Sequence, residues 1–183
     1  SEDTLFLADM YLSLAGAKGE TGDLAADVSL KKKAIEIYEK LYNTNPNDVT
    51  AENNLAKGYF FIATPMKFVG DTNGAIENLQ KSAEIYQKLA NQVPNEPKYL
   101  RNVALSYKYI PPLYLKTQNS KDAINFSQKA SEIDEKRLSS APNDLQIKYD
   151  LSRSYEILAE SFLENGQIEK AEEIAAKALN LVK

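Results

Sequence analysis

A short apolar phrase returns four times in this chain, each time 48 residues further along. It begins with a leucine or valine followed by a small residue, and a tyrosine stands four positions after the first residue. The four copies are Leu7-Ala8-x-x-Tyr11, Leu55-Ala56-x-x-Tyr59, Val103-Ala104-x-x-Tyr107 and Leu151-Ser152-x-x-Tyr155. A fixed period of this length predicts one supersecondary unit repeated about four times. Such a stack offers an extended surface, which is suited to holding another molecule.

Other landmarks keep the same spacing. Ala75, Ala123 and Ala171 are 48 residues apart, and a proline followed by asparagine and an acidic residue recurs at 46–48, 94–96 and 142–144. The four copies align without a gap. We therefore interpret the whole chain as one array of repeats.

The periodicity inside each repeat is helical. Apolar residues such as Leu55, Tyr59 and Ile62 recur at steps of three and four, whereas no alternating strand pattern occurs. A polar break divides each repeat into a first helix, A, and a second helix, B. Eight helices are predicted, at about 3–18, 24–44, 48–68, 72–92, 96–117, 120–140, 144–164 and 167–182.

Prolines interrupt two of the predicted A helices. Pro65 and the pair Pro111-Pro112 fall inside the helical pattern, where proline removes one backbone hydrogen bond and clashes with the preceding turn. We therefore predict a kink or break near 61–65 and 108–112. The fourth A helix has no proline and is expected to be straighter.

The repeated phrases resemble the motifs of tetratricopeptide repeats (TPRs). Leu-Ala-x-x-Tyr resembles their Leu-Gly-x-x-Tyr, Ala75-x-x-x-Leu79 resembles their Ala-x-x-x-Phe, and the corner prolines resemble their closing proline. The resemblance implies an all-α fold, a right-handed α-solenoid of about four antiparallel helix pairs. It also implies a single domain over 1–183, with repeats at about 1–48, 49–96, 97–144 and 145–183.

The period differs from that of the family. It exceeds the usual ~34 residues by about 14, which is about two extra turns in each helix. A long-helix variant of this kind is similar to the arrays attached to bacterial Ser/Thr kinases and other large signalling proteins. We expect the chain to be a piece of such a protein, with a free-standing protein as the alternative.

The composition excludes several kinds of chemistry. Histidine and cysteine are both absent, which removes the commonest general base and the thiolate ligands of metal sites. No glycine-rich phosphate-binding loop and no long apolar run occur. We expect no catalysis, no metal and no cofactor. The pI of about 5.1, without a basic stripe, argues against nucleic acid as a partner.

The resemblance implies a binding surface. In TPR arrays the A helices line a concave groove, and the residues beside the tyrosine motif point into it. Transferred position by position, the candidate ligand-binding residues are Asn53, Asn54, Lys57, Lys98, Arg101, Asn102, Leu105, Lys108, Tyr149 and Arg153. Asparagine suits the binding of a peptide backbone, because its amide both donates and accepts. Solvated polar residues without a ligand are the alternative for the three asparagines.

The charge distribution suggests the chemistry of the partner. Residues 53–116 carry eight basic and four acidic side chains, although the whole chain has a net charge of −4. A locally positive groove favours an acidic peptide. Two functions stay open: a scaffold that binds a peptide or partner domain in its groove, and a spacer module that stacks through its ends. A monomer is favoured, and an end-to-end dimer is the alternative.

Overall fold

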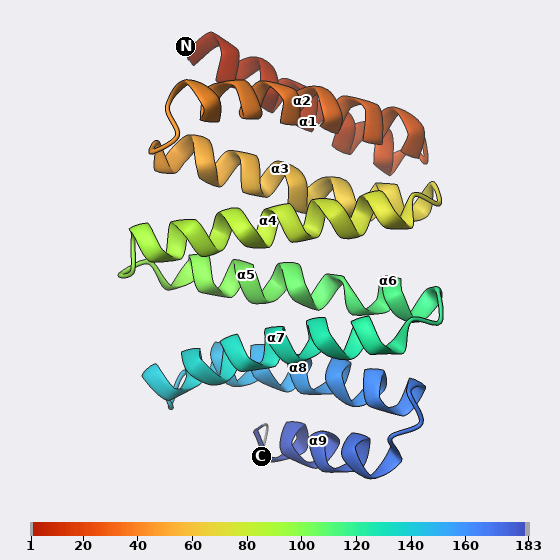
Figure 1. Ribbon diagram of the computed structural model, residues 1–183. Helices are drawn as coiled ribbons and strands as arrows, with labels where there is room; N and C mark the ends of the chain where they lie inside the picture. The colour runs from red at the N-terminus through yellow and green to blue at the C-terminus, as the bar shows by residue number, and fades with distance from the viewer. Residues whose placement is uncertain (1, 182–183) are drawn as a thin grey trace. The chain divides into compact units, whose positions relative to one another are not determined.

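A computed structural model describes residues 2–181 of the chain, and within this range all regular structure is helical (Figure 1). The chain forms two compact units, Ser1–Glu96 and Pro97–Lys183. No helix in the described part of the chain is long and apolar enough to cross a membrane.

The first unit contains two antiparallel helix pairs. Its helices are α1 (Glu2–Glu20), α2 (Leu24–Thr44), α3 (Val49–Phe68) and α4 (Thr72–Gln92). α1 packs against α2, α2 against α3, and α3 against α4, so successive helices lie side by side (Figure 1). Each A helix is therefore followed by its own B helix, and α3 is packed between two B helices.

The second unit repeats this arrangement with one interruption. Its helices are α5 (Pro97–Tyr109), α6 (Pro111–Lys116), α7 (Ser120–Ser140), α8 (Leu145–Glu164) and α9 (Ile168–Leu181). α5 and α6 both pack along α7, which then packs against α8, and α8 pairs with α9 (Figure 1). α5 and α6 together occupy the place of one A helix.

Side-chain caps fix the helix starts. Asp48 accepts hydrogen bonds from the backbone N–H groups of Thr50 and Ala51, and Asp71 accepts one from Gly74. Each such cap stabilises a helix by about 1 kcal/mol. The B helices begin at Leu24, Thr72, Ser120 and Ile168, which are 48 residues apart. In the first three repeats Asp23, Asp71 and Asn119 cap the B helix in the same way.

The predicted helices agree with the structure to within two residues, apart from the prolines; the predicted end at 182 lies outside the described residues. The predicted break near 108–112 is confirmed, because α5 ends at Tyr109 and α6 begins at Pro111. Pro111 and Pro112 occupy the first turn of α6, where a missing N–H costs nothing. The predicted fourth A helix, α8, runs without interruption.

A kink or break is predicted near 61–65, and of these two the break does not occur. α3 continues through Pro65 to Phe68, although the residue is buried inside the helix. Pro65 lies in the last turn of α3, and its nitrogen has no N–H to donate to the carbonyl of Phe61. Its ring packs in the core, and its backbone carbonyl still accepts a hydrogen bond from Val69 N–H. Packing therefore keeps the helix intact there.

Candidate functional site

Three predicted ligand-binding residues lie on α3 in the first unit. Asn53 and Asn54 are half-buried, and Lys57 is exposed. Phe61, one turn beyond Lys57, is also exposed, and its ring meets that of Phe60 edge to face at 5.5 Å between centroids. α3 thus presents a cationic and aromatic stripe to solvent.

The other predicted residues lie on α5 and α8 in the second unit. Lys98, Arg101, Asn102, Leu105 and Lys108 belong to α5, whereas Tyr149 and Arg153 belong to α8. One ion pair joins the two helices: Arg101 Nε lies 2.8 Å from Asp150 Oδ2, and its Nη2 lies 3.3 Å from Oδ1. The structure therefore connects α5 and α8 through Arg101 and Asp150.

Lys108 does not belong to the exposed part of this face, which corrects its assignment as a ligand-binding residue. Its side chain is buried, and Nζ donates to Asp134 Oδ2 at 2.7 Å and to the backbone carbonyl of Asp150 at 2.8 Å. A buried cation needs such partners because desolvation disfavours its charge. Lys108 links α5 to α7 and α8 and is not available to a ligand.

Lys108 belongs to a charged cluster of five side chains: Arg101, Lys108, Asp134, Arg137 and Asp150. Asp134 is fully buried and accepts from Lys108, from Arg137 and from the Ser154 hydroxyl. Arg137 also reaches Asp150 Oδ2 at 3.0 Å. The cluster therefore joins α5, α7 and α8 through hydrogen bonds to charged groups.

The cluster has an uneven charge. It contains three cations and two carboxylates, so one positive charge is not matched within it. Lys108 and Arg137 are buried, whereas the Arg101 side chain is 41% exposed. The surplus positive charge therefore reaches the surface at Arg101.

The hydrogen-bond partners of Asp150 change the pKa of its carboxyl group. Burial raises the pKa of Asp150, but hydrogen bonds from Arg101, Gln146 and Arg137 outweigh burial and hold it below its ordinary value. The hydrogen bond to Asp150 raises the pKa of Arg101 in turn. Both groups therefore stay charged at neutral pH.

Other exposed aromatic and charged residues lie on the same two helices as Arg101 and Asp150. Tyr109 on α5 and Tyr149 on α8 are exposed, as is Lys98. Arg153 pairs with Glu156 one turn along α8, and both side chains are about half exposed. An exposed pair of this kind contributes little energy and can exchange partners. We name the residues Lys98, Arg101, Tyr109, Tyr149 and Arg153 the α5–α8 face.

The sequence interpretation missed Asp134, Arg137 and Asp150 as partners of the predicted residues. These partners can be recognised when the residues at equivalent positions of the repeats are compared. Asp134 stands where the two preceding repeats have Tyr38 and Tyr86, and Arg137 stands where the second repeat has Leu89. Charged residues at positions that are apolar elsewhere in the array indicate a buried ionic cluster.

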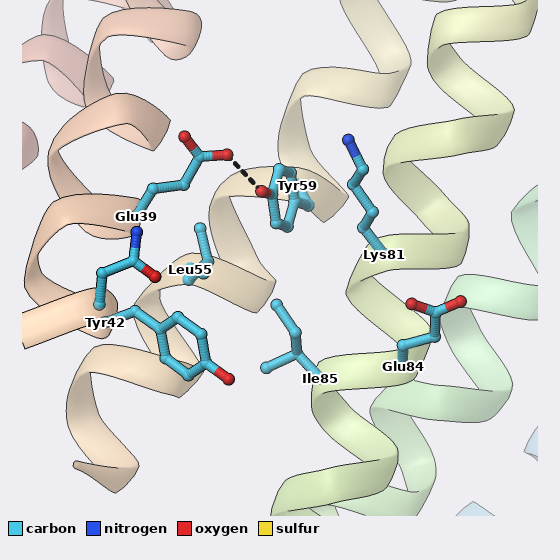
Figure 2. Close-up of a pocket in the computed structure, with 8 residues that line it drawn as sticks. Glu39, Tyr42, Leu55, Tyr59, Lys81, Glu84 and Ile85 are labelled. Carbon is cyan, nitrogen blue, oxygen red and sulfur yellow. Dashed lines mark hydrogen bonds between the residues drawn. The ribbon is translucent and has the colours of Figure 1, made fainter. Parts of the chain in front are cut away.

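The first unit has a surface pocket of about 300 Å³ between α2, α3 and α4 (Figure 2). Its lining is Glu39, Tyr42, Asn43, Leu55, Tyr59, Lys81, Glu84 and Ile85. The Tyr59 hydroxyl donates to Glu39 at one side of the pocket, and Lys81 Nζ lies 5.6 Å from the Tyr59 ring centroid. In the second unit the positions of Tyr42 and Ile85 hold Leu138 and Leu181, which pack onto the core. The pocket is thus a feature of the first unit's own side chains.

The Tyr59 hydroxyl makes the stability of the fold decrease as the pH rises in the alkaline range. Burial, and then the hydrogen bond to Glu39, raise the pKa of this hydroxyl above its ordinary value of about 10. The folded state then keeps a proton that the unfolded state loses. The contribution of the Tyr59 hydroxyl to the free energy of unfolding is fully present below about pH 10. Above that pH the free energy of unfolding falls by up to about 1.4 kcal/mol per pH unit.

We therefore expect Tyr59→Phe to reduce the loss of stability above about pH 10. Urea unfolding of wild type and variant across this range measures the difference. Tyr149→Phe, at an exposed tyrosine, is the matched control and should keep the wild-type slope. An unchanged slope in Tyr59→Phe would contradict the assigned role of the Tyr59–Glu39 hydrogen bond.

Comparisons with known proteins identify the fold. No protein-family model matches the sequence, and no curated protein matches it. BtubC from P. vanneervenii has a similar crystal structure, with a TM-score of 0.72 and 20% identity over 96% of this chain and 63% of BtubC. This chain thus spans less than two thirds of the length of BtubC.

Two other solved structures are helical repeats. The de novo designed helical repeat protein DHR64 matches with a TM-score of 0.56 and 15% identity, over 98% of this chain and 92% of DHR64. A putative kinesin light chain from Podosopora anserina with nearly identical TPR-like repeats matches over 99% of this chain and 96% of its own length, at 18% identity. The TM-score of this match is 0.41. The fold is therefore an α-solenoid of the helical-repeat kind.

Proposed function

We propose that this chain is a non-catalytic protein-interaction scaffold whose α5–α8 face binds an acidic segment of a partner protein. The observation that carries this proposal is the surplus positive charge of the buried cluster, which reaches solvent at Arg101. An acidic side chain of a ligand would supply the carboxylate that the cluster lacks.

The residues around Arg101 favour protein as the ligand. Arginine and tyrosine are the residue types most enriched in the energetic centres of protein interfaces. The α5–α8 face exposes both types, in Arg101, Arg153, Tyr109 and Tyr149. Asn102 and Leu105 on α5 are half-buried beside them. A peptide on this face would meet cations, aromatic rings and an amide.

A second contact region on α3 is part of the same proposal. Asn53, Asn54 and Lys57 occupy the corresponding part of the first unit, together with the exposed Phe61. We propose that these residues form a contact region of the first unit for a partner protein. We also propose that the array belongs to a larger signalling protein, as the resemblance to long-helix TPR arrays suggests.

Peptide selection tests the proposed site. A displayed peptide library should yield acidic binders whose affinity, measured by fluorescence anisotropy, weakens with added salt as exposed charges are screened. Arg101→Gln removes the surface charge but keeps an amide donor for Asp150. We expect it to weaken binding at least about tenfold, or 1.4 kcal/mol.

Lys136→Gln is the matched control, because it removes one exposed positive charge from α7 in the same unit. It should leave the affinity within about twofold, since it changes only the long-range charge. Circular dichroism verifies that both variants are folded. Equal losses in the two variants, or selected peptides without acidic residues, would contradict the proposed site.

A further inference from the structure

The pocket of the first unit carries an excess of negative charge. Glu39 lines it from α2 and Glu84 from α4 (Figure 2), and neither forms an ion pair with another described residue. Glu39 Oε1 accepts the hydrogen bond of the Tyr59 hydroxyl, and no described residue donates to its Oε2. Lys81 also lines the pocket, but its Nζ pairs with Glu77 Oε1 at 2.7 Å. The lining thus has two carboxylates and one cation, and that cation has its own partner.

A hydrogen-bonded lysine holds one wall of the pocket in place. Lys88 Nζ donates to the Tyr42 hydroxyl at 3.2 Å and to the Pro46 carbonyl at 2.9 Å. It also donates to Glu52, which is fully buried. Glu52 Oε2 is buried without a hydrogen-bond partner among the described residues, so this arrangement costs stability. Groups that are kept at such a cost are typical of functional sites.

The equivalent junction of the second unit separates the structural parts of the pocket from the added ones. Glu135 accepts a hydrogen bond from Tyr155 at 2.8 Å there, so this tyrosine–glutamate contact is part of the repeat. The positions of the tyrosine wall and of the second carboxylate hold Leu138 and Asn180 instead. The first unit therefore adds an aromatic wall and a second carboxylate to a contact that the repeat already has.

We propose that this pocket binds the side chain of a lysine from a partner protein. Leu55 and Ile85 lie between the two carboxylates (Figure 2) and provide apolar contact for the aliphatic stem. The ammonium group has rotatable donors, so carboxylates on two walls can share it. The planar fork of arginine suits a carboxylate with two free oxygens, whereas one oxygen of Glu39 is already occupied.

The size of the pocket favours a protein as the source of the lysine. Its volume of about 300 Å³ is at the lower limit of ligand sites, which suits one side chain. A contact this small gives little affinity by itself, because association has a large entropic cost. A partner protein supplies further contacts outside the pocket, and a free amine does not.

The inference is independent of the proposed function. The pocket belongs to α2, α3 and α4, whereas the α5–α8 face belongs to the second unit. The two sites also select opposite charges. Loss of lysine binding at the pocket therefore leaves the acidic-peptide experiment at Arg101 unaffected, and the reverse also holds.

A nuclear magnetic resonance titration of the full nitrogen-15-labelled chain tests the pocket. The probes are capped Gly-X-Gly peptides in which X is lysine, arginine or norleucine. We expect the lysine peptide to give saturable shifts of the Leu55 and Ile85 amides. Norleucine keeps the stem without the ammonium group and should bind at least about threefold more weakly, the effect of losing a partly exposed ion pair. The arginine peptide should also bind more weakly than the lysine peptide.

Three variants assign the binding to the pocket carboxylates. Glu39→Gln removes the charge but keeps an oxygen that can accept from Tyr59, and it should weaken binding of the lysine peptide at least about threefold. Glu135→Gln is the matched control, because it changes the same repeat position and the same tyrosine contact in the second unit. It should leave the affinity within about twofold. Lys81→Gln removes a competing cation and should strengthen binding.

Four results overturn the proposal, provided that circular dichroism shows the variants to be folded. They are an absence of shifts at Leu55 and Ile85 with the lysine peptide, equal affinity for the lysine and norleucine peptides, and equal losses in Glu39→Gln and Glu135→Gln. The fourth is tighter binding of n-butylamine than of the lysine peptide, which would identify a free amine as the occupant.

Discussion

Asp134→Ala should lower the free energy of unfolding by about 3–5 kcal/mol, the cost of breaking a buried ion pair by removing one partner. Asp134 is fully buried and is the carboxylate shared by Lys108 and Arg137, which are themselves buried. Removing it leaves Arg101, Lys108 and Arg137 with one remaining carboxylate, Asp150. Urea unfolding followed by circular dichroism measures the loss.

Replacing Lys108, Asp134 and Arg137 together should lower the free energy of unfolding far less than Asp134→Ala does. The second repeat holds Phe60, Tyr86 and Leu89 at the positions of Lys108, Asp134 and Arg137. A triple variant carrying those residues removes both signs of charge at once, and apolar replacements of buried ion pairs are often neutral or stabilising. It also removes Arg137 Nε, a buried atom without a hydrogen-bond partner among the described residues.

We therefore expect the triple variant to be more stable than Asp134→Ala. If the triple variant unfolds as easily as Asp134→Ala, the repeat positions are not interchangeable and the packing comparison is wrong. If Asp134→Ala is as stable as wild type, the cluster is not an integral part of the second unit.

Tyr38→Ala should cost about 3–5 kcal/mol, as truncation of a large buried aromatic residue does. Tyr38 is 2% exposed, and its ring lies close to Gly58 of α3. Its hydroxyl also donates to Asp9 Oδ1 at 2.8 Å. The variant loses both the packing between α2 and α3 and the hydrogen bond to α1.

Two variants separate these contributions. Tyr38→Phe keeps the ring and should cost only about 1.5–3 kcal/mol, the usual value for a hydrogen bond to a charged group. Tyr149→Ala removes the same side chain from an exposed position and should stay within about 0.5 kcal/mol of wild type. Similar losses in Tyr38→Ala and Tyr149→Ala would show that the assigned burial is wrong.

The helices were predictable because their signals are local. Asp48 and Asp71 cap helices by contacts within three residues, and the apolar steps around Leu55 and Tyr59 indicate a buried helical face directly. The effect of proline depended on its position in the helix. Pro111 starts a new helix, whereas Pro65 lies in the last turn of α3, and the sequence pattern alone did not separate the two cases.

The site was less predictable because it depends on pairing between distant residues. The helical pattern of the sequence assigned Arg101 and Tyr149 to the correct helices. It did not show which basic side chains are paired with a carboxylate. Lys108 was grouped with Arg101 because both are basic residues of α5. The partner that buries it, Asp134, lies 26 positions further on in α7. Only a comparison of repeat positions, with Phe60 and Tyr86 as the counterparts, indicates that these two residues replace an apolar pair.

A nuclear magnetic resonance titration tests the proposed binding face most directly. The full chain, labelled with nitrogen-15, is titrated with an acidic peptide selected as above, and the side-chain Nε–H signal of Arg101 is followed together with the backbone amides. The proposal predicts a shift of the Arg101 Nε–H signal and of amides around Tyr109, Tyr149 and Arg153. Shifts confined to α7 and α9, with an unchanged Arg101 signal, would contradict the assignment of this face as the binding site.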